Sequence, residues 1–311
     1  MLAFGPVPSR RLGYSLGINH IPPKHCPYAC VYCQVGRTNA LSITQQSFYP
    51  LDQILGDVKE KVLAAQASAR TIDYLTLVPD GEPALDANLG NLILALKQFN
   101  IPIAVISNAA LMHLPDVQQS LLSADWVSLK VDAVLENEWR LINRPHRRLS
   151  LPKILDNILS FRNSFRGEFV TETMLVGGVN DNDAALSKLF YFLQKLNPHV
   201  SYLSIPTRPP AEAWVKPPDA ANLQRSLDLL SGKLPFLELM FTAEPADFVA
   251  TGNIVEDILA TTAVHPIREK ALQLMLGQAG EEWSLIENLL LNKKIVRINY
   301  RNENFYLGKS S

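Results

Sequence analysis

Short apolar runs and longer amphipathic segments alternate along the first 250 residues of the chain. Each run rich in β-branched or other apolar residues is followed by a segment with the 3.6-residue period of a helix. The strand-like runs are Ser15–Ile21, Ile72–Val78, Ile101–Ile106, Trp126–Val131, Phe169–Val176 and Val200–Ile205, and the helix-like segments are 51–68, 87–99, 114–123, 150–164, 183–196 and 219–231. This alternation predicts an α/β fold with parallel strands, as a whole or partial barrel or as an open doubly wound sheet. In each case the site lies at the carboxyl ends of the strands.

The last sixty residues follow a different pattern. Helical patterns at 253–260, 266–277 and 281–292 precede two short strands joined by a polar turn. Three helices followed by a hairpin predict a small winged-helix-like C-terminal domain over residues 250–311, beside a large domain over residues 1–245. Such a module is a candidate for binding nucleic acid. A module that packs against the core or contacts another protein is the alternative, because acidic and basic residues are balanced, seven against seven, in 250–311.

Composition is that of an ordinary folded protein. The 311 residues are 47% hydrophobic and 19% charged, with a formal net charge of −1, which excludes general disorder. No run approaches the roughly 18 apolar residues of a membrane span, and the N-terminus does not resemble a signal peptide, because its basic pair follows the apolar residues. We therefore expect a cytoplasmic protein that does not enter a membrane.

Charge is unevenly distributed along the chain. Residues 1–51 contain no Asp or Glu but include Arg10, Arg11, Lys24 and Arg37, and a second basic group lies within residues 140–148, after the fourth strand-like run. Both groups are candidates to neutralise an anionic centre or to hold phosphates, with structural ion pairs as the alternative.

All three cysteines, Cys26, Cys30 and Cys33, lie within eight residues after the first strand-like run. An odd, clustered number in a chain expected to be cytoplasmic favours metal ligation or redox chemistry over disulfides. A structural zinc site would need a fourth ligand, for which His20 and His25 are the candidates. An iron–sulfur cluster normally takes four cysteines, so three would leave one iron open to another group.

The C-x3-C-x-aromatic-C spacing, with Tyr32 as the aromatic residue, resembles the signature of radical S-adenosylmethionine (radical SAM) enzymes. The resemblance implies a [4Fe–4S] cluster on Cys26, Cys30 and Cys33, with S-adenosyl-L-methionine (SAM) chelating the open iron. It implies a partial (β/α)6, TIM-like barrel and reductive cleavage of SAM to a 5′-deoxyadenosyl radical that abstracts hydrogen from a substrate. An external electron donor of the flavodoxin or ferredoxin type follows from the same resemblance.

Two further strand ends carry residues that match the family. Gly81 and Glu82 resemble its glycine–glutamate motif, which binds the methionine amino group, although Asp80 stands where a small residue is usual. A carboxylate accepting from an ammonium beside a glycine turn makes chemical sense, while Asp-Gly also forms ordinary turns. Ser107 and Asn108 resemble the Thr/Ser-Asn segment that ends the third strand of the family.

The fourth strand-like run ends in Lys130 and Asp132. Period-two alternation puts both side chains, with Ser128, on one face. Polar groups facing a barrel interior bind one another or a ligand. The resemblance implies that Lys130 and Asp132 reach the ribose and carboxylate of SAM, and a buried Lys–Asp pair is the alternative. On the fifth run, Glu172 is a candidate to face inward.

A narrower resemblance covers residues 4–218. It rests on Gly5–Gly13, Ser15–Gly17, Gly36–Thr38, Asp80–Pro83, Ile142–Pro145 and Pro206–Pro210. These segments resemble a group of Fe–S oxidoreductase-like radical SAM proteins related to the tRNA wyosine-forming enzymes, the 4-demethylwyosine synthases. Those enzymes hold a second cluster on extra cysteines, and no cysteine remains here for one, which disfavours wyosine synthesis itself.

The substrate stays unidentified, with tRNA or another anionic molecule as the candidate. Two alternatives to a radical SAM enzyme stay open. One is a non-enzymatic, zinc-stabilised nucleic-acid-binding protein. The other is a cluster-bearing activating or sensing partner of another protein.

Overall fold

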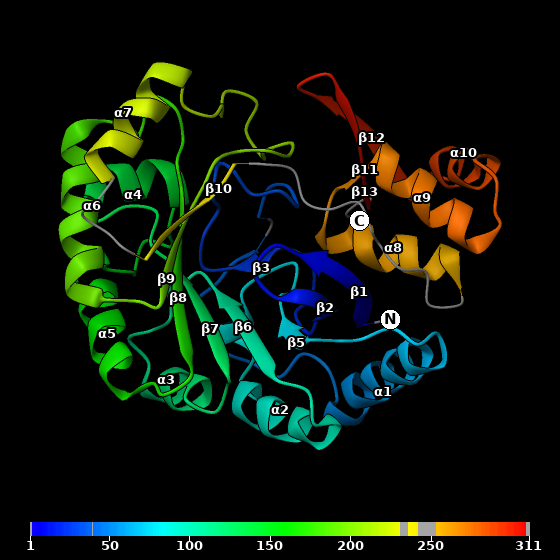
Figure 1. The fold of residues 1–311 in the computed structure, drawn as a ribbon. Coiled ribbons are helices and arrows are strands. Elements are labelled where there is room, and N and C mark those ends of the chain that lie inside the picture. The colour runs from blue at the N-terminus through cyan, green and yellow to red at the C-terminus, as the bar shows by residue number, and fades with distance from the viewer. Residues whose placement is uncertain (1, 39, 231–235, 242–252, 309–311) are drawn as a thin grey trace.

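An eight-stranded sheet forms the centre of the larger part of the molecule (Figure 1). The computed structural model describes residues 2–38, 40–230, 236–241 and 253–308. The strands lie in the order β1 (Ala3–Ser9), β2 (Gly13–Ile18), β5 (Tyr74–Leu77), β6 (Ile103–Ser107), β7 (Trp126–Lys130), β8 (Glu168–Met174), β9 (Val200–Ser204) and β10 (Leu237–Met240). Neighbours from β2 to β10 are parallel, and β1 is antiparallel to β2. Two short strands, β3 (His25–Cys26) and β4 (Ala40–Leu41), pair separately.

Helices cover the outer face of this curved sheet (Figure 1). They are α1 (Leu51–Ala67), α2 (Leu89–Leu96), α3 (Pro115–Leu121), α4 (Glu136–Asn143), α5 (Leu151–Ser164), α6 (Asp183–Leu196) and α7 (Ala220–Leu230), with 3-10 turns at Pro83–Leu85 and Lys97–Phe99. Each amphipathic helix buries its apolar stripe against the strands, as Ile54, Val58 and Val62 do on α1. The result is a partial barrel of the TIM type, open to one side.

The structure confirms the predicted α/β class and the mostly parallel sheet. Each of the predicted strand-like runs overlaps a strand, and each helix-like segment contains a helix. Three elements of the barrel were missed. Strand β1 carries Pro6 and Pro8. An edge strand tolerates prolines, but two of them in a short run are not typical of a strand, so the sequence did not predict one. Strand β10 and helix α4 are short.

The C-terminal part has its own core beside the sheet. It comprises α8 (Ile254–Val264), β11 (Ile267–Arg268), α9 (Glu269–Ala279), α10 (Ser284–Leu291), β12 (Ile295–Tyr300) and β13 (Glu303–Gly308). The strands form a three-stranded sheet in the order β11-β13-β12, and the core includes the fully buried Ile258, Leu272 and Ile286. The predicted boundary between residues 245 and 250 lies outside the described residues.

The C-terminal part packs against β1 and α1 of the barrel (Figure 1). Val7 of β1 contacts its apolar core. Lys61 of α1 and Asp257 of α8 form an ion pair of 2.5 Å, with both side chains at most 4% exposed. The Tyr300 hydroxyl donates to the carbonyl oxygen of Pro206 at 3.2 Å. These contacts place the loop after α8 beside the open side of the barrel.

In the described part of the chain, none of the helices combines the length and the apolar character that crossing a membrane requires.

Candidate cofactor site

A cavity of about 320 Å³ lies at the carboxyl ends of the strands. It is lined by nine of the ten site residues expected from the sequence: Cys26, Cys30, Tyr32, Cys33, Gly81, Glu82, Ser107, Asn108 and Lys130. The tenth, Asp132, is buried behind this wall. The strand-end rule therefore brings residues from four separate segments to one cavity.

The cysteine loop is held by amide groups from two other segments. The Nδ2 of Asn108 lies 3.2 Å from Cys26 Sγ, and the Nδ2 of Asn143 lies 3.4 Å from Cys30 Sγ. Burial raises the pKa of Cys30 to about 12 and that of Cys26 well above its ordinary value, and the neighbouring acids add to both shifts. Without a cation these thiols stay protonated, whereas a bound metal centre deprotonates coordinating thiols. The loop is thus chemically suited to a cationic metal centre.

The donor set fits an iron–sulfur cluster better than a zinc ion. Among the residues that the structure describes, no three His, Cys, Asp or Glu side chains are gathered to hold a single ion. Neither His20 nor His25, the candidates for a fourth zinc ligand, lines the cavity. In a [4Fe–4S] cluster each cysteine binds a different iron, so the sulfurs need not converge on one point.

Glu82 sits at the base of the cavity in a ring of donors. Its carboxylate accepts from Ser107 Oγ at 2.6 Å, from the Asn108 backbone N–H at 2.7 Å and from the Ala84 backbone N–H at 3.0 Å. Burial nevertheless raises the pKa of Glu82 to about 7. The preceding Gly81 is required sterically, because a Cβ atom there would collide with the carbonyl oxygen of His25. A carboxylate so placed suits an ammonium ligand.

Asp80, the departure from the usual glycine–glutamate motif, is paired within the protein. Its Oδ1 lies 2.9 Å from Lys24 Nζ, and both side chains are at most 5% exposed. The Lys24 backbone N–H also donates to the Asp80 carbonyl at 2.8 Å. The acidic residue at this position therefore ties the segment before the cysteines to the Gly81 turn.

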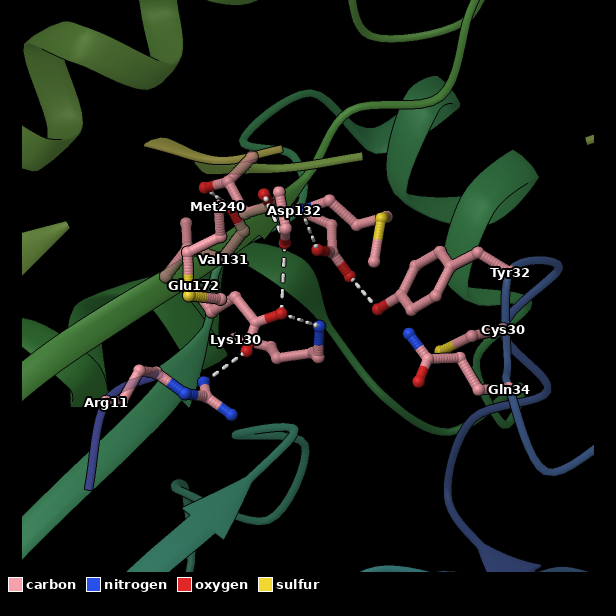
Figure 2. Close-up of polar contacts among 12 residues, drawn as sticks. Arg11, Cys30, Tyr32, Gln34, Lys130, Val131, Asp132, Glu172 and Met240 are labelled. Atoms are coloured by element: carbon pink, nitrogen blue, oxygen red, sulfur yellow. Dashed lines mark hydrogen bonds and ion pairs between the residues drawn. The ribbon is translucent and has the colours of Figure 1, made fainter. Parts of the chain in front are cut away.

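Lys130 and Glu172 form the centre of an ionic group on the strand ends (Figure 2). Glu172 lies 3.3 Å from Lys130 Nζ and 2.5 Å from Arg11 Nη1, and it accepts from Ser204 Oγ at 3.0 Å. Burial acts to raise the pKa of Glu172, but Lys130 and Arg11 lower it overall. Lys130 Nζ also lies 4.9 Å from the ring centroid of Tyr32, so the cation is within reach of both the cysteine loop and the cavity.

The structure differs from the expectation at Asp132. This carboxylate accepts from the Tyr32 hydroxyl, from Asn143 Nδ2 at 2.7 Å and from the Met174 backbone N–H at 2.9 Å. Strand β7 ends at Lys130, and Asp132 is not among the residues that line the cavity. Asp132 therefore positions Tyr32 and the cysteine loop from behind instead of facing the cavity.

The first basic group is divided in the structure, because Arg37 lies outside the cavity lining and pairs with Glu212 at 3.2 Å, the acid that Arg144 of the second group also binds. Arg10, Arg11 and Lys24 line the cavity, whereas no residue of 140–148 does. In that second group Arg140 pairs with Glu136 at 2.6 Å and Arg144 pairs with Glu212 at 2.7 Å.

Arg208 and His265 also line the cavity and received no role from the sequence. Arg208 follows β9 and lies in the Pro206–Pro210 segment that carries the narrower resemblance. His265 follows α8 of the C-terminal part, and nothing in the sequence signals that it lies at this cavity.

Comparison with known proteins gives a consistent result. The family model of the radical SAM superfamily matches residues 21–190. A UPF0026 protein of Methanocaldococcus jannaschii is 42% identical over 309 residues, which covers 98% of this chain and 95% of the relative. A UPF0026 protein of Helicobacter pylori strain J99 is 30% identical over 297 residues, which covers 94% of this chain and 93% of the relative.

Solved structures share the fold. A radical SAM methyltransferase from Sphaerobacter thermophilus superposes with a TM-score of 0.56 at 16% identity, over 73% of this chain and 67% of that one. TYW1 with a lysine-pyruvate adduct bound gives a TM-score of 0.53 at 15% identity, over 70% of this chain and 72% of that one. With the clustered cysteines at the carboxyl ends of a mostly parallel partial barrel, the family match identifies the chain as a radical SAM enzyme, a member of the radical SAM superfamily.

Proposed function

We propose that the protein binds a [4Fe–4S] cluster on Cys26, Cys30 and Cys33 and uses it with SAM to abstract hydrogen from an anionic substrate. The observation that carries the proposal is that the three cysteines and the motif residues Glu82 and Asn108 line one cavity. When bound, such a cluster supplies the electron for reductive cleavage of SAM to methionine and a 5′-deoxyadenosyl radical.

The residues of the chain would bind and orient the two cofactors. Glu82, with Gly81 making the turn, would accept from the amino group of SAM, and Ser107 and the Asn108 backbone fix its carboxylate in place. Asn108 and Asn143 would donate to cluster-bound sulfurs, as their amides already do to the free thiols. These contacts stabilise thiolate charge in a buried site.

Lys130 is our candidate for the SAM carboxylate or ribose. It lines the cavity and keeps its charge, because Glu172 and Asp132 raise its pKa overall although burial acts to lower it. Tyr32 would shield the cofactors from water through its ring. Asp132, which lies behind the wall, would act only by holding Tyr32 in place.

The remaining partners are also proposals. An external flavodoxin- or ferredoxin-type donor would supply the electron, as radical SAM enzymes generally need an external reductant. The substrate is proposed to be anionic, with tRNA as one candidate, because Arg10 and Arg11 line the cavity. The cytoplasm remains the expected compartment, on the ground of the clustered cysteines.

We also propose that residues 1–245 and 250–311 are two domains and that the second is a winged-helix domain. Its order of helix, strand, two helices and two strands, with a hairpin at the end, supports this interpretation. Nucleic acid or protein is the partner class of such a domain.

Anaerobic reconstitution tests the central proposal. The protein should take up about four irons and four sulfides per chain, turn brown, and release 5′-deoxyadenosine from SAM when dithionite is added. A colourless protein that binds one zinc would contradict it and favour the zinc-stabilised alternative. Transfer of deuterium into 5′-deoxyadenosine from labelled candidate substrates then identifies the substrate class.

A further inference from the structure

A further pocket, at the surface of the molecule, touches the cysteine loop. Cys30 lines both this pocket and the cofactor cavity, and Arg37, Arg144 and Glu212 lie in the wall of the pocket. A centre bound to the cysteines therefore comes within reach of the outside of the molecule at Cys30. The proposed function assigns no role to this pocket.

Two segments that are remote in the sequence are fixed against this part of the loop by hydrogen bonds. The Ala29 backbone N–H donates to the carbonyl oxygen of Asn143 at 3.0 Å, and Asn143 Nδ2 lies 3.4 Å from Cys30 Sγ. In the second segment, the Glu212 backbone N–H donates to the carbonyl oxygen of Val31 at 3.0 Å. The residues around the pocket are thus held in place relative to Cys30.

Basic side chains dominate the exposed surface around the pocket. Arg37, which is 74% exposed, and Arg144, which is 43% exposed, share the carboxylate of Glu212 at 3.2 Å and 2.7 Å. Arg147 and Arg148 follow on the segment of Arg144, are exposed, and form no ion pair within the described part of the chain. Residues 1–51, which include the cysteine loop, contain no Asp or Glu. Four arginines therefore stand against one carboxylate here.

A large aromatic residue adjoins these charges. Trp214 is 44% exposed and follows Glu212 by two residues, in a turn that the Val215 backbone N–H closes onto the Glu212 carbonyl oxygen at 3.1 Å. Tryptophan and arginine are enriched among the residues that contribute most to protein–protein binding, so their combination at an exposed surface favours a protein partner. We call these residues the outer patch: Arg37, Arg144, Arg147, Arg148 and Trp214.

We propose that the outer patch is the docking surface of the external electron donor, a small acidic protein that carries one electron at a time. The inference rests on the proposed function, because it takes Cys30 to be a ligand of the iron–sulfur cluster. Electron transfer needs a short path between two centres, and Cys30 offers one because it lines the surface pocket. The donor is oxidised by one electron, the cluster is reduced by the same electron, and no bond forms or breaks in this step.

Charge and location together explain the choice of partner. Flavodoxins and ferredoxins are acidic proteins, and complementary charge steers such partners into an encounter with a basic surface. Electron-transfer complexes have small interfaces, which fits a patch of a few exposed arginines around one aromatic residue. A donor at this surface reaches the cysteine loop from the pocket, so the cofactor cavity stays free for SAM and substrate.

Docking can be measured without turnover. The full-length reconstituted protein is titrated with an oxidised flavodoxin and, separately, with an oxidised ferredoxin, by isothermal titration calorimetry at several chloride concentrations. We expect at least one of them to bind saturably, with an affinity that falls as chloride rises. Arg147→Glu/Arg148→Glu and, independently, Arg37→Glu should each weaken binding by about tenfold or more, because like charges then face each other.

A control variant separates the outer patch from the charge of the whole protein. Lys59→Glu/Arg166→Glu changes the net charge as much as Arg147→Glu/Arg148→Glu does, at two exposed positions on α1 and before β8. This control should bind the donor like the wild type. An equal loss of binding in the control and the patch variants would overturn the site in favour of non-specific attraction.

The aromatic residue has a different signature. Trp214→Ala removes apolar contact area but no charge, so it should weaken donor binding by a similar factor at every chloride concentration. Donor binding that is unchanged in Trp214→Ala would remove Trp214 from the docking surface.

Activity with two reductants separates docking from chemistry. Dithionite is a small reductant that needs no docking surface, so SAM cleavage driven by dithionite should be unchanged in the arginine variants. Cleavage driven by the reduced flavodoxin or ferredoxin should slow by about tenfold or more in the same variants. Donor-driven cleavage at the wild-type rate in both would refute the site. Loss of tRNA binding in these variants, with donor binding retained, would overturn it in favour of nucleic acid.

The proposed function and the docking surface can fail separately. Donor binding that depends on the outer patch, in a protein that cleaves no SAM with dithionite, would refute the proposed function alone. SAM cleavage with dithionite by a protein that binds neither donor, or whose donor binding is unaffected by the arginine variants, would refute the docking surface alone.

Discussion

The cavity is bounded by two walls that the chain builds in different ways. The cysteine wall, which we define as Cys26, Cys30, Cys33 and Glu82, comes from one loop and the next strand end. The arginine wall, which we define as Arg10, Arg208 and His265, comes from the β1–β2 turn, the segment after β9 and the C-terminal part. A wall made by one loop leaves a spacing pattern in the sequence. A wall made by packing remote segments leaves no such spacing pattern.

The walls also differ in charge. On the cysteine wall, burial raises the pKa of Cys30 to about 12 and of Glu82 to about 7. On the arginine wall, burial and neighbouring cations lower the pKa of Arg208 to about 9. The cysteine wall therefore suits positively charged ligands, a cationic centre and an ammonium, whereas the arginine wall is itself cationic.

The largest effect is expected from the cysteine wall. Cys30→Ala should reduce bound iron sharply and lower 5′-deoxyadenosine formation to background, because the chain has no fourth cysteine to replace the ligand. Ser42→Ala, a comparable truncation in the following segment and outside the cavity lining, is the control. Iron content and SAM cleavage measured together provide the test, and retained cleavage in Cys30→Ala would contradict the ligand assignment.

The arginine wall depends on how the C-terminal part packs against the barrel, and the buried ion pair between α1 and α8 should contribute to the stability of that packing. Lys61→Met breaks the ion pair with the buried Asp257, and breaking a buried ion pair by removing one partner costs about 3–5 kcal/mol. Urea unfolding should show that loss, while Lys59→Met, an exposed change on the same helix, should show almost none. The double variant Lys61→Met/Asp257→Leu should recover much of the stability. If Lys61→Met were as stable as the wild type, the ion pair would not stabilise the contact between α1 and α8.

This contrast also explains what the sequence could predict. Parallel strands, their helices and the cysteine loop depend on local pattern, and the structure contains all of them. The Pro-containing edge strand β1 was missed, because its stability comes from pairing with β2. Asp132 does not line the cavity, because its carboxylate accepts from Tyr32, Asn143 and the Met174 backbone, contacts that the strand pattern does not report. The place of His265 depends on how α8 packs against β1, which periodicity does not report.

A smaller effect is expected on the pH dependence of SAM binding, through Glu82 of the cysteine wall. Glu82, whose pKa is raised to about 7, is a carboxylate above that pH and protonated below it. Its attraction for the SAM ammonium is therefore lost as the pH falls through 7, and SAM affinity should drop by about tenfold for each further unit. Equilibrium SAM binding between pH 5.5 and 8.5, roughly one and a half units to either side of that pKa, measures this. Glu82→Gln should bind weakly with a flat profile, and Glu60→Gln, exposed on α1, should keep the wild-type profile. A wild-type affinity that does not change across this range would exclude Glu82 as the ammonium ligand.

The smallest effect should come from Tyr32, which lies in the cysteine loop between Cys30 and Cys33. Its hydroxyl donates to Asp132, and Lys130 lies over its ring (Figure 2). Tyr32→Phe removes only the hydroxyl, and Asp132 keeps its bonds from Asn143 and the Met174 backbone. The free energy of unfolding should therefore fall by about 1 kcal/mol, with iron content unchanged, while Tyr191→Phe, 74% exposed on α6, should change neither. Because the ring remains, a large loss of iron in Tyr32→Phe would mean that the Tyr32–Asp132 bond is essential to the cysteine wall, so that Asp132 would count among the residues that build it.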